Sequence, residues 1–152
     1  MSFLGELFTN KIFLAPAAGW FFAQIIKTIV ETCRSGFSVE RLYGCGGMPS
    51  SHAATVTGLA VITGMFYGPS SFEFVLALFL GIIVIYDARG VRFETQRQGR
   101  ALNNLNEERE EEGKQPLDII RFKEKMGHTI PELFVGMLIG ITSAIVVFYL
   151  PF

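Results

Sequence analysis

The sequence is poor in charge and in cysteine, and each shortage excludes a class of protein. Charged residues make up 18% of the 152 residues and nearly cancel, which leaves a net charge of −1. No strong basic field is therefore available to bind nucleic acid. Cys33 and Cys45 are the only cysteines, so the chain has neither a disulfide framework nor the spacing of a zinc or redox motif. They could form one disulfide, but we expect reduced, structural thiols.

Apolar surface is what the chain has in abundance. Half of the residues are hydrophobic, and the charged ones cluster within residues 89–125. Four long apolar segments result, at 12–30, 52–67, 72–86 and 133–152. A membrane-spanning helix needs about 20 apolar residues, with a lower limit of about 17. The first and last segments reach this length alone, and the middle two reach it with their small polar flanks.

These segments predict an all-α fold, a single polytopic membrane domain over residues 1–152 with about four transmembrane helices. A soluble helical bundle is the alternative, but helices that are apolar all round would leave little polar surface for water. A cleaved N-terminal signal peptide is a second alternative. The first residues lack the basic stretch that such a peptide needs.

Basic residues gather in the two connections that would share one side of the membrane, 34–51 and 87–128. These connections hold eleven of the thirteen lysines and arginines, all except Lys11 and Lys27. The positive-inside rule places both connections in the cytoplasm and both termini outside. Within the charged cytoplasmic loop at 87–128, Glu94–Glu112 has good helix formers and no proline, so we expect a helix there.

The chain has only two histidines, and both fall at the start of an expected span on the same membrane face. His52 begins the second span and His128 precedes the fourth. Ionisable side chains near lipid are costly, so two of them at matching depth make a functional site the default hypothesis. A pair of structural, interfacial histidines is the alternative.

A glycine-rich stretch leads directly into the first of these histidines, with the sequence Gly44-Cys45-Gly46-Gly47-Met48-Pro49-Ser50-Ser51-His52. Glycines let backbone N–H groups approach an anion, and Ser50 or Ser51 can cap the helix whose N-terminus offers free donors. The stretch is not a Walker loop, because no lysine follows the glycines at the required place. It predicts an anion site, with a flexible turn and a serine cap as the alternative.

The same residues carry a family resemblance. Pro49-Ser50-Ser51-His52 resembles the Pro-Ser-Gly-His motif of the type 2 phosphatidic acid phosphatase and vanadium haloperoxidase superfamily. Lys27 and Arg34 match its Lys, six residues, Arg spacing, and His128 with Glu132 resembles its closing His, three residues, Asp. Over nearly its full length the chain is similar to a divergent membrane branch of that superfamily.

The chain departs from the superfamily pattern at three positions, the first being Ser35, where the superfamily has a proline after the arginine. Glu132 stands where the superfamily has an aspartate, and Phe122 stands where it has an arginine. Basic residues flank this gap at positions 121, 123 and 125. Arg89 or Arg92, at the end of the third span, is an alternative source of the guanidinium.

The resemblance implies metal-free phosphoryl transfer in two steps, without a cofactor. His128 would attack phosphorus and form a phosphohistidine, Glu132 would hold its ring, and His52 would protonate the leaving oxygen. The implied phosphate-binding residues are Lys27, Arg34, Gly47, Ser50, Ser51, Arg89 and Arg92. The expected function is that of a membrane phosphatase acting on a lipid phosphate or lipid pyrophosphate, in contact with membrane lipids and with no nucleic acid partner.

A second class of function stays open. A non-catalytic membrane protein that binds or carries lipid phosphates would keep the anion pocket without turnover, and the phenylalanine at position 122 favours it. The basic side chains of the implied site could instead snorkel toward the headgroups. Gly136 and Gly140 form a small-xxx-small face in the last span and predict helix contact. A homodimer packed through glycine faces is a further arrangement open to the chain.

Overall fold

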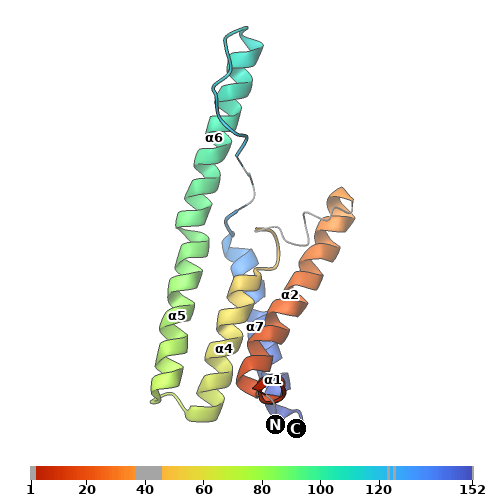
Figure 1. Cartoon of the computed structure of the whole chain (residues 1–152), viewed down its shortest axis with the longest axis vertical. Coiled ribbons are helices and arrows are strands. Elements are labelled where there is room, and N and C mark those ends of the chain that lie inside the picture. The colour runs from red at the N-terminus through yellow and green to blue at the C-terminus, as the bar shows by residue number, and fades with distance from the viewer. Residues whose placement is uncertain (1–2, 37–45, 123, 125, 152) are drawn as a thin grey trace.

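The structure is a computed structural model, and it describes residues 3–36, 46–122, 124 and 126–151. All regular structure among these residues is helical, with no β-strand. The helices are α1 (Phe3–Thr9), α2 (Lys11–Ser35), α4 (Ser51–Tyr67), α5 (Phe72–Arg89), α6 (Val91–Glu111) and α7 (Ile130–Tyr149). The predicted all-α membrane bundle is confirmed (Figure 1).

Helix α4 lies at the centre of the bundle. It packs against α2, α5 and α7, and α2 also packs against α7. Figure 1 shows α5 on one side of α4 and the α2–α7 pair on the other. Ser50 caps the start of α4, and Gly68, with a φ of +82°, ends it. A non-glycine residue would be strained in that left-handed conformation, so the glycine fixes where the helix stops.

Small residues let the helices of this core approach each other closely. A Cβ on Gly140 of α7 would run into the Ala54 carbonyl of α4, and Gly58 of α4 faces the backbone of Ala15 in α2. Gly136 similarly lies against α4. The prediction that Gly136 and Gly140 make a helix contact is therefore confirmed. Because this contact lies within one chain, these two glycines are not a free face for a dimer.

The outer faces of the bundle carry large apolar side chains. Trp20 of α2 is 51% exposed, Ile83 of α5 is 64% exposed and Phe134 of α7 is 56% exposed. Such a surface suits lipid and not water. Within the described ranges, three helices are long and apolar enough to cross a membrane: α2, α5 with its continuation α6, and α7. Helix α4 has 17 residues, at the lower limit for a span, so a total of four spans depends on this central helix.

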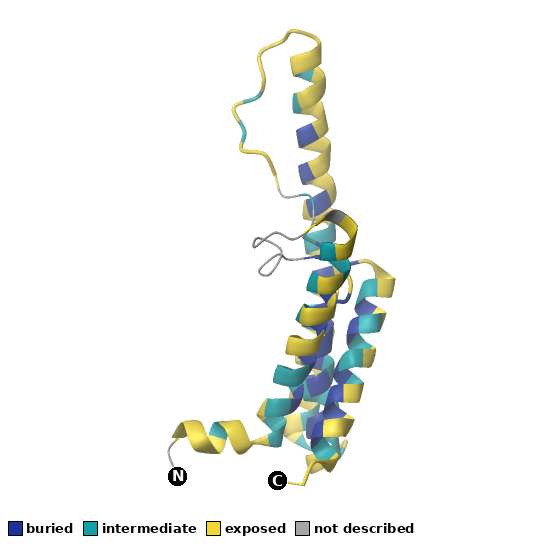
Figure 2. Cartoon of the chain, turned by 90° about the vertical axis from the view of Figure 1, so that its right-hand side faces the viewer, coloured by how far each residue is buried: buried dark blue, intermediate teal, exposed yellow. Residues whose placement is uncertain are grey.

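Helix α6 continues α5 beyond the bundle as a projecting arm (Figures 1 and 2). It occupies Val91–Glu111, where the sequence predicts a helix over Glu94–Glu112. Residues 112–122 then return along α6 without regular structure, and polar side chains of α6 bond to their backbone. Asn106 accepts a hydrogen bond from the Leu117 N–H at 2.6 Å, and Asn103 both accepts from and donates to the backbone of Phe122 at 3.0 Å.

The opposite end of the bundle holds α1, a short helix that the sequence did not predict (Figure 2). The Asn10 side chain caps α2 by accepting a hydrogen bond from the Ile12 N–H at 2.9 Å. The Lys11 ammonium donates to the carbonyls of Phe148 at 3.0 Å and Leu150 at 2.6 Å. A cation at the C-terminus of α7 also complements the helix dipole. The start of α2 and the end of α7 are thereby joined.

Candidate active site

The two histidines lie side by side where two helices begin. His52 is the second residue of α4, and His128 stands two residues before α7. Their ring centroids are 6.0 Å apart, and the ring planes make an angle of 63°. One phosphoryl group could contact both rings at this separation, since each contact needs about 3 Å.

Each imidazole has a buried nitrogen without a hydrogen-bond partner. The Nδ1 atoms of His52 and His128 are shielded from solvent, and neither finds a partner within the described part of the chain. His128 as a whole is only 1% exposed. An unsatisfied buried polar group costs about 1–3 kcal/mol of folding free energy. A catalytic or binding role is one reason for a native protein to retain such a group, so these two nitrogens support a functional site.

The crossing of α4 and α7 brings these histidines together. Gly46 and Gly47 approach α4 with φ values of +91° and +85°, which glycine adopts without strain. The buried Ser50 caps α4, its Oγ accepting a hydrogen bond from the Ala53 N–H at 3.3 Å. The Ser50 N–H donates to the Glu132 carbonyl at 3.0 Å. The N-termini of α4 and α7 are therefore bonded directly to each other.

Glu132 lies beside His128 in the first turn of α7. Its Oε2 is 3.4 Å from the His128 Nδ1, which is an ion-pair distance but exceeds the roughly 2.7–3.2 Å of an N–H···O hydrogen bond. The same oxygen accepts a hydrogen bond from the Thr129 N–H at 2.9 Å. A small rotation of the carboxylate would give Nδ1 a partner and fix the tautomer of the ring.

His52 lies in the electrostatic field of two basic residues, one from α2 and one from α6. Lys27 is only 2% exposed although it lies within α2, a helix able to cross a membrane. The charged groups that act on His52 are Arg92 and Lys27, together with Asp87 and the neighbouring histidine. Arg92 Nε is 2.6 Å from Asp87 Oδ2, so this carboxylate orients the guanidinium. A buried lysine in a membrane protein is itself a sign of function.

The remaining residues of the predicted site lie around this centre. Arg89 is exposed and its guanidinium lies over the Phe93 ring, 5.4 Å from the centroid, so Arg92 is the arginine that acts on His52. Ser51 is buried at the start of α4. Arg34 lines an adjoining cavity of about 350 Å³. The other residues of that cavity are Val30, Glu31, Gly47, Met48, Phe93, Gln96, Arg100, Gly127, Thr129 and Glu132.

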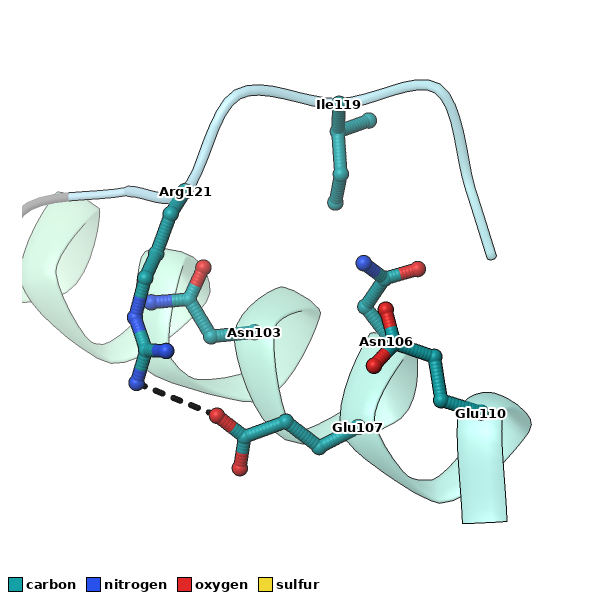
Figure 3. Close-up of a pocket in the computed structure, with 6 residues that line it drawn as sticks. All are labelled: Asn103, Asn106, Glu107, Glu110, Ile119 and Arg121. Carbon is teal, nitrogen blue, oxygen red and sulfur yellow. Dashed lines mark ion pairs between the residues drawn. The ribbon is translucent and has the colours of Figure 1, made fainter. Parts of the chain in front are cut away.

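Arg121 and Phe122 both bond to side chains of α6 on the arm. The backbone of Phe122 is bonded to Asn103 of α6. Arg121 pairs with Glu107 of α6 at 3.0 Å, beside a cavity of about 210 Å³ (Figure 3). The lysines at positions 123 and 125 lie outside the described residues. Of the alternative guanidinium sources, Arg92 is the one that acts on His52.

Sequence reasoning missed Gln96, which contacts the segment entering His128. Its signal was a polar repeat at Gln96, Arg100 and Asn103, spaced as one face of a helix. In the described ranges, no three His, Cys, Asp or Glu side chains converge as metal ligands would. Cys33 is a free, exposed thiol, and Cys45 lies outside the described residues.

Comparison with known proteins supports the resemblance seen in the motifs. The model of the divergent PAP2 family matches residues 8–143. The chain is 33% identical to the uncharacterized membrane protein YuiD of Bacillus subtilis (strain 168), an alignment that covers 95% of this chain and 98% of that protein. No solved structure matches the chain. By family match and by this relative, the chain belongs to the divergent PAP2 family.

Proposed function

We propose that this protein is an integral membrane phosphatase that removes phosphate from a lipid phosphate or lipid pyrophosphate through a phosphohistidine. The observation that carries the proposal is the pair of histidines, 6.0 Å apart, at the bonded N-termini of α4 and α7. Membership of the divergent PAP2 family supports a phosphatase of this kind.

The first chemical step forms a covalent enzyme intermediate. The Nε2 of His128 attacks phosphorus, because Glu132 lies next to the Nδ1 of that ring and can accept its proton in a hydrogen bond. A nitrogen–phosphorus bond forms as the bond from phosphorus to the leaving oxygen breaks. His52 donates a proton to that oxygen, which departs as the lipid alcohol or lipid monophosphate.

The second step restores the enzyme. Water attacks phosphorus, and His52, now neutral, takes one proton from it as the nitrogen–phosphorus bond breaks. Inorganic phosphate leaves, and both histidines regain their starting protonation. Throughout, Lys27 and Arg92 offset the negative charge of the phosphoryl oxygens, assisted by the positive dipole end of α4.

The place of the site in the fold favours a lipid substrate. The histidines lie where α4 and α7 begin, and α7 is a helix able to cross a membrane. A phosphate bound there would lie at the depth of lipid headgroups, with its hydrocarbon chain free to remain in the bilayer. The adjoining cavity, about 350 Å³ and lined by Arg34, Gly47 and Glu132, offers room for the rest of a polar headgroup.

A binding or carrier protein for lipid phosphates is the second candidate. The observation that favours it is Phe122, at the position where the superfamily has an arginine. The Glu132 Oε2 also lies 3.4 Å from the His128 Nδ1, longer than the roughly 2.7–3.2 Å of an ordinary hydrogen bond. Such a protein would hold the phosphate between the same groups without transferring it.

Phosphate release from a panel of lipid phosphates and pyrophosphates, by purified protein in detergent without added metal, separates the two candidates. A phosphatase should release inorganic phosphate, be inhibited by vanadate as a transition-state analogue, and trap label from a ³²P-substrate on His128. His128→Ala should lose both turnover and label. Tight binding of lipid phosphate without any release across pH and metal conditions would overturn the phosphatase in favour of the carrier.

A further inference from the structure

Gln96 of α6 contacts the two residues that directly precede His128. Its side chain is buried, and its Oε1 accepts hydrogen bonds from the backbone N–H groups of Met126 and Gly127, both at 3.1 Å. One side-chain oxygen thus satisfies two successive peptide groups. Neither group belongs to a helix, so neither has an intrahelical partner.

Two further contacts fasten the same stretch to the junction of α5 and α6. The His128 N–H donates to the Ala88 carbonyl of α5 at 3.1 Å. Gly127 lies so close to the backbone of Phe93 in α6 that a Cβ would run into it. The backbone that carries His128 is therefore placed by α5 and α6, ahead of the first turn of α7.

We propose that Gln96 is a positioning residue for His128. Through its hydrogen bonds to Met126 and Gly127 it sets where the His128 ring lies relative to His52 and Glu132. The inference rests on the proposed function, in which His128 is the nucleophile. It extends that function to a residue of the arm that lies outside every superfamily motif quoted above.

The physical reason is that the N–H groups of Met126 and Gly127 have no helical acceptor and depend on the Gln96 oxygen. His128 precedes α7, so helical hydrogen bonds do not fix its backbone. Without the Gln96 oxygen, two N–H groups at a largely buried position would lose their acceptor, and the stretch would have to move to regain one. A displacement of about 1 Å in a reacting group can cost on the order of a hundredfold in rate.

Two substitutions of Gln96 distinguish the effect of its acceptor oxygen from the effect of its side-chain size. Gln96→Glu keeps an acceptor oxygen at the same reach, whereas Gln96→Met keeps a similar length and shape without a strong acceptor. We expect Gln96→Met to lower kcat on the order of a hundredfold, with KM changed less than about threefold. Gln96→Glu keeps the acceptor but adds a carboxylate to the cavity beside the phosphate site, so it should lower kcat less than Gln96→Met does. Gln98→Met, at an exposed position of the same helix, is the matched control and should behave as the unmodified protein.

A second readout does not require turnover. The chain has just two histidines, so their ring resonances can be recorded by NMR in detergent and assigned with His52→Ala. Gln96→Met should shift the His128 ring resonances, while Gln98→Met should leave them in place. If Gln96→Met does not fold, Gln96→Asn takes its place, because its oxygen is one methylene too short to reach both N–H groups.

The outcomes distinguish this inference from the proposed function. If the unmodified protein releases no phosphate, the phosphatase fails, and the His128 resonances alone decide whether Gln96 positions the ring. If the protein is active, either a normal kcat or unmoved His128 resonances in Gln96→Met would overturn the positioning role. An equal loss of kcat in Gln96→Glu and Gln96→Met would also overturn it.

Discussion

At the scale of single residues, the candidate site buries polar groups at a cost in folding free energy. Two buried imidazole nitrogens have no hydrogen-bond partner in the described part of the chain, and Lys27 is buried within a helix able to cross a membrane. In a fold with a net stability of roughly 5–15 kcal/mol, each unsatisfied imidazole nitrogen is a substantial cost. A bound phosphate would relieve this cost by accepting hydrogen bonds from the imidazoles.

The two histidines should respond differently to the leaving group of the substrate. His52→Ala should slow phosphoenzyme formation most for lipid alkoxides, which need a proton to depart, by roughly 10²–10⁴-fold. An activated ester such as p-nitrophenyl phosphate should partly escape this loss, because its leaving group departs without protonation. His128→Ala should abolish turnover of both substrates. Quench-flow measurement of the ³²P-phosphoenzyme tests this, and equal losses for both substrates in His52→Ala would contradict the acid role.

Arg92 and Arg89 form a matched pair with which to test the cation assignment. Arg92→Gln should lower kcat/KM on the order of a hundredfold, as expected when a preorganised charge near the phosphoryl oxygens is lost. Its partner Asp87 is 42% exposed, so leaving that carboxylate without the arginine should cost little stability. Arg89→Gln should change kcat/KM less than about threefold, since Arg89 lies over Phe93 and is exposed. The reverse ranking in steady-state kinetics would assign the clamp to Arg89.

At the scale of helices, capping residues explain why some boundaries are readable from sequence. The second and third segments are predicted to begin at residues 52 and 72, and Ser50 and Ser71 cap helices that begin at Ser51 and Phe72. The sequence could not show that α5 continues into α6, because a charged helix outside the membrane has no apolar run to mark it. Nor could it choose Arg92 over Arg89, since that depends on how the chain turns at Gly90.

Most of the candidate site was nevertheless open to prediction, because its motifs lie at helix N-termini that meet. The part that was not predictable is the return of the chain along α6. Its register depends on side-chain amides such as Asn103 and Gln96 bonding to a backbone that is distant in sequence. Helix propensity depends on neighbouring residues and does not report such long-range hydrogen bonds. The sequence therefore predicts helix α6 but not the segment that packs along it.

The crossing of α4 and α7 should be intolerant of a single added methyl group. In Gly140→Ala the new Cβ would run into the Ala54 carbonyl, which is backbone and cannot rotate away. We expect a loss of about 1–3 kcal/mol in the free energy of unfolding, as for overpacked cores. Gly81→Ala is the matched control, because its Cβ would meet α4 at an ordinary 3.6 Å. Thermal unfolding in detergent compares the two, and an equal effect would contradict the packing described.

At the scale of the whole molecule, the fold separates a polar end from an apolar bundle. The arm formed by α6 and its return segment projects from the end where the histidines lie, while α1 and the end of α7 lie at the other (Figure 1). The charge pattern follows this division, since the two connections on the histidine side hold eleven of the thirteen lysines and arginines. The candidate site, most of the basic residues and the projecting arm therefore lie at the same end of the molecule.

That asymmetry predicts the orientation of the chain in the membrane. The positive-inside rule places the arm and the histidines in the cytoplasm and both termini outside, and the acidic residues of α6 contribute little to this preference. Single cysteines in a background with Cys33→Ser and Cys45→Ser report it. Glu110→Cys lies on the arm, and Ser70→Cys lies in the exposed turn between α4 and α5, at the opposite end.

In sealed cells, a maleimide that cannot cross the membrane should label Ser70→Cys and leave Glu110→Cys unmodified. Opening the membrane should make Glu110→Cys reactive, which serves as the control that its thiol is accessible. Labelling of Glu110→Cys in sealed cells would reverse the orientation and put the histidines at the outer face. Because the candidate active site shares its end with the arm, the same measurement decides which leaflet would supply the proposed lipid phosphate. We expect the inner leaflet, because the basic residues favour that topology.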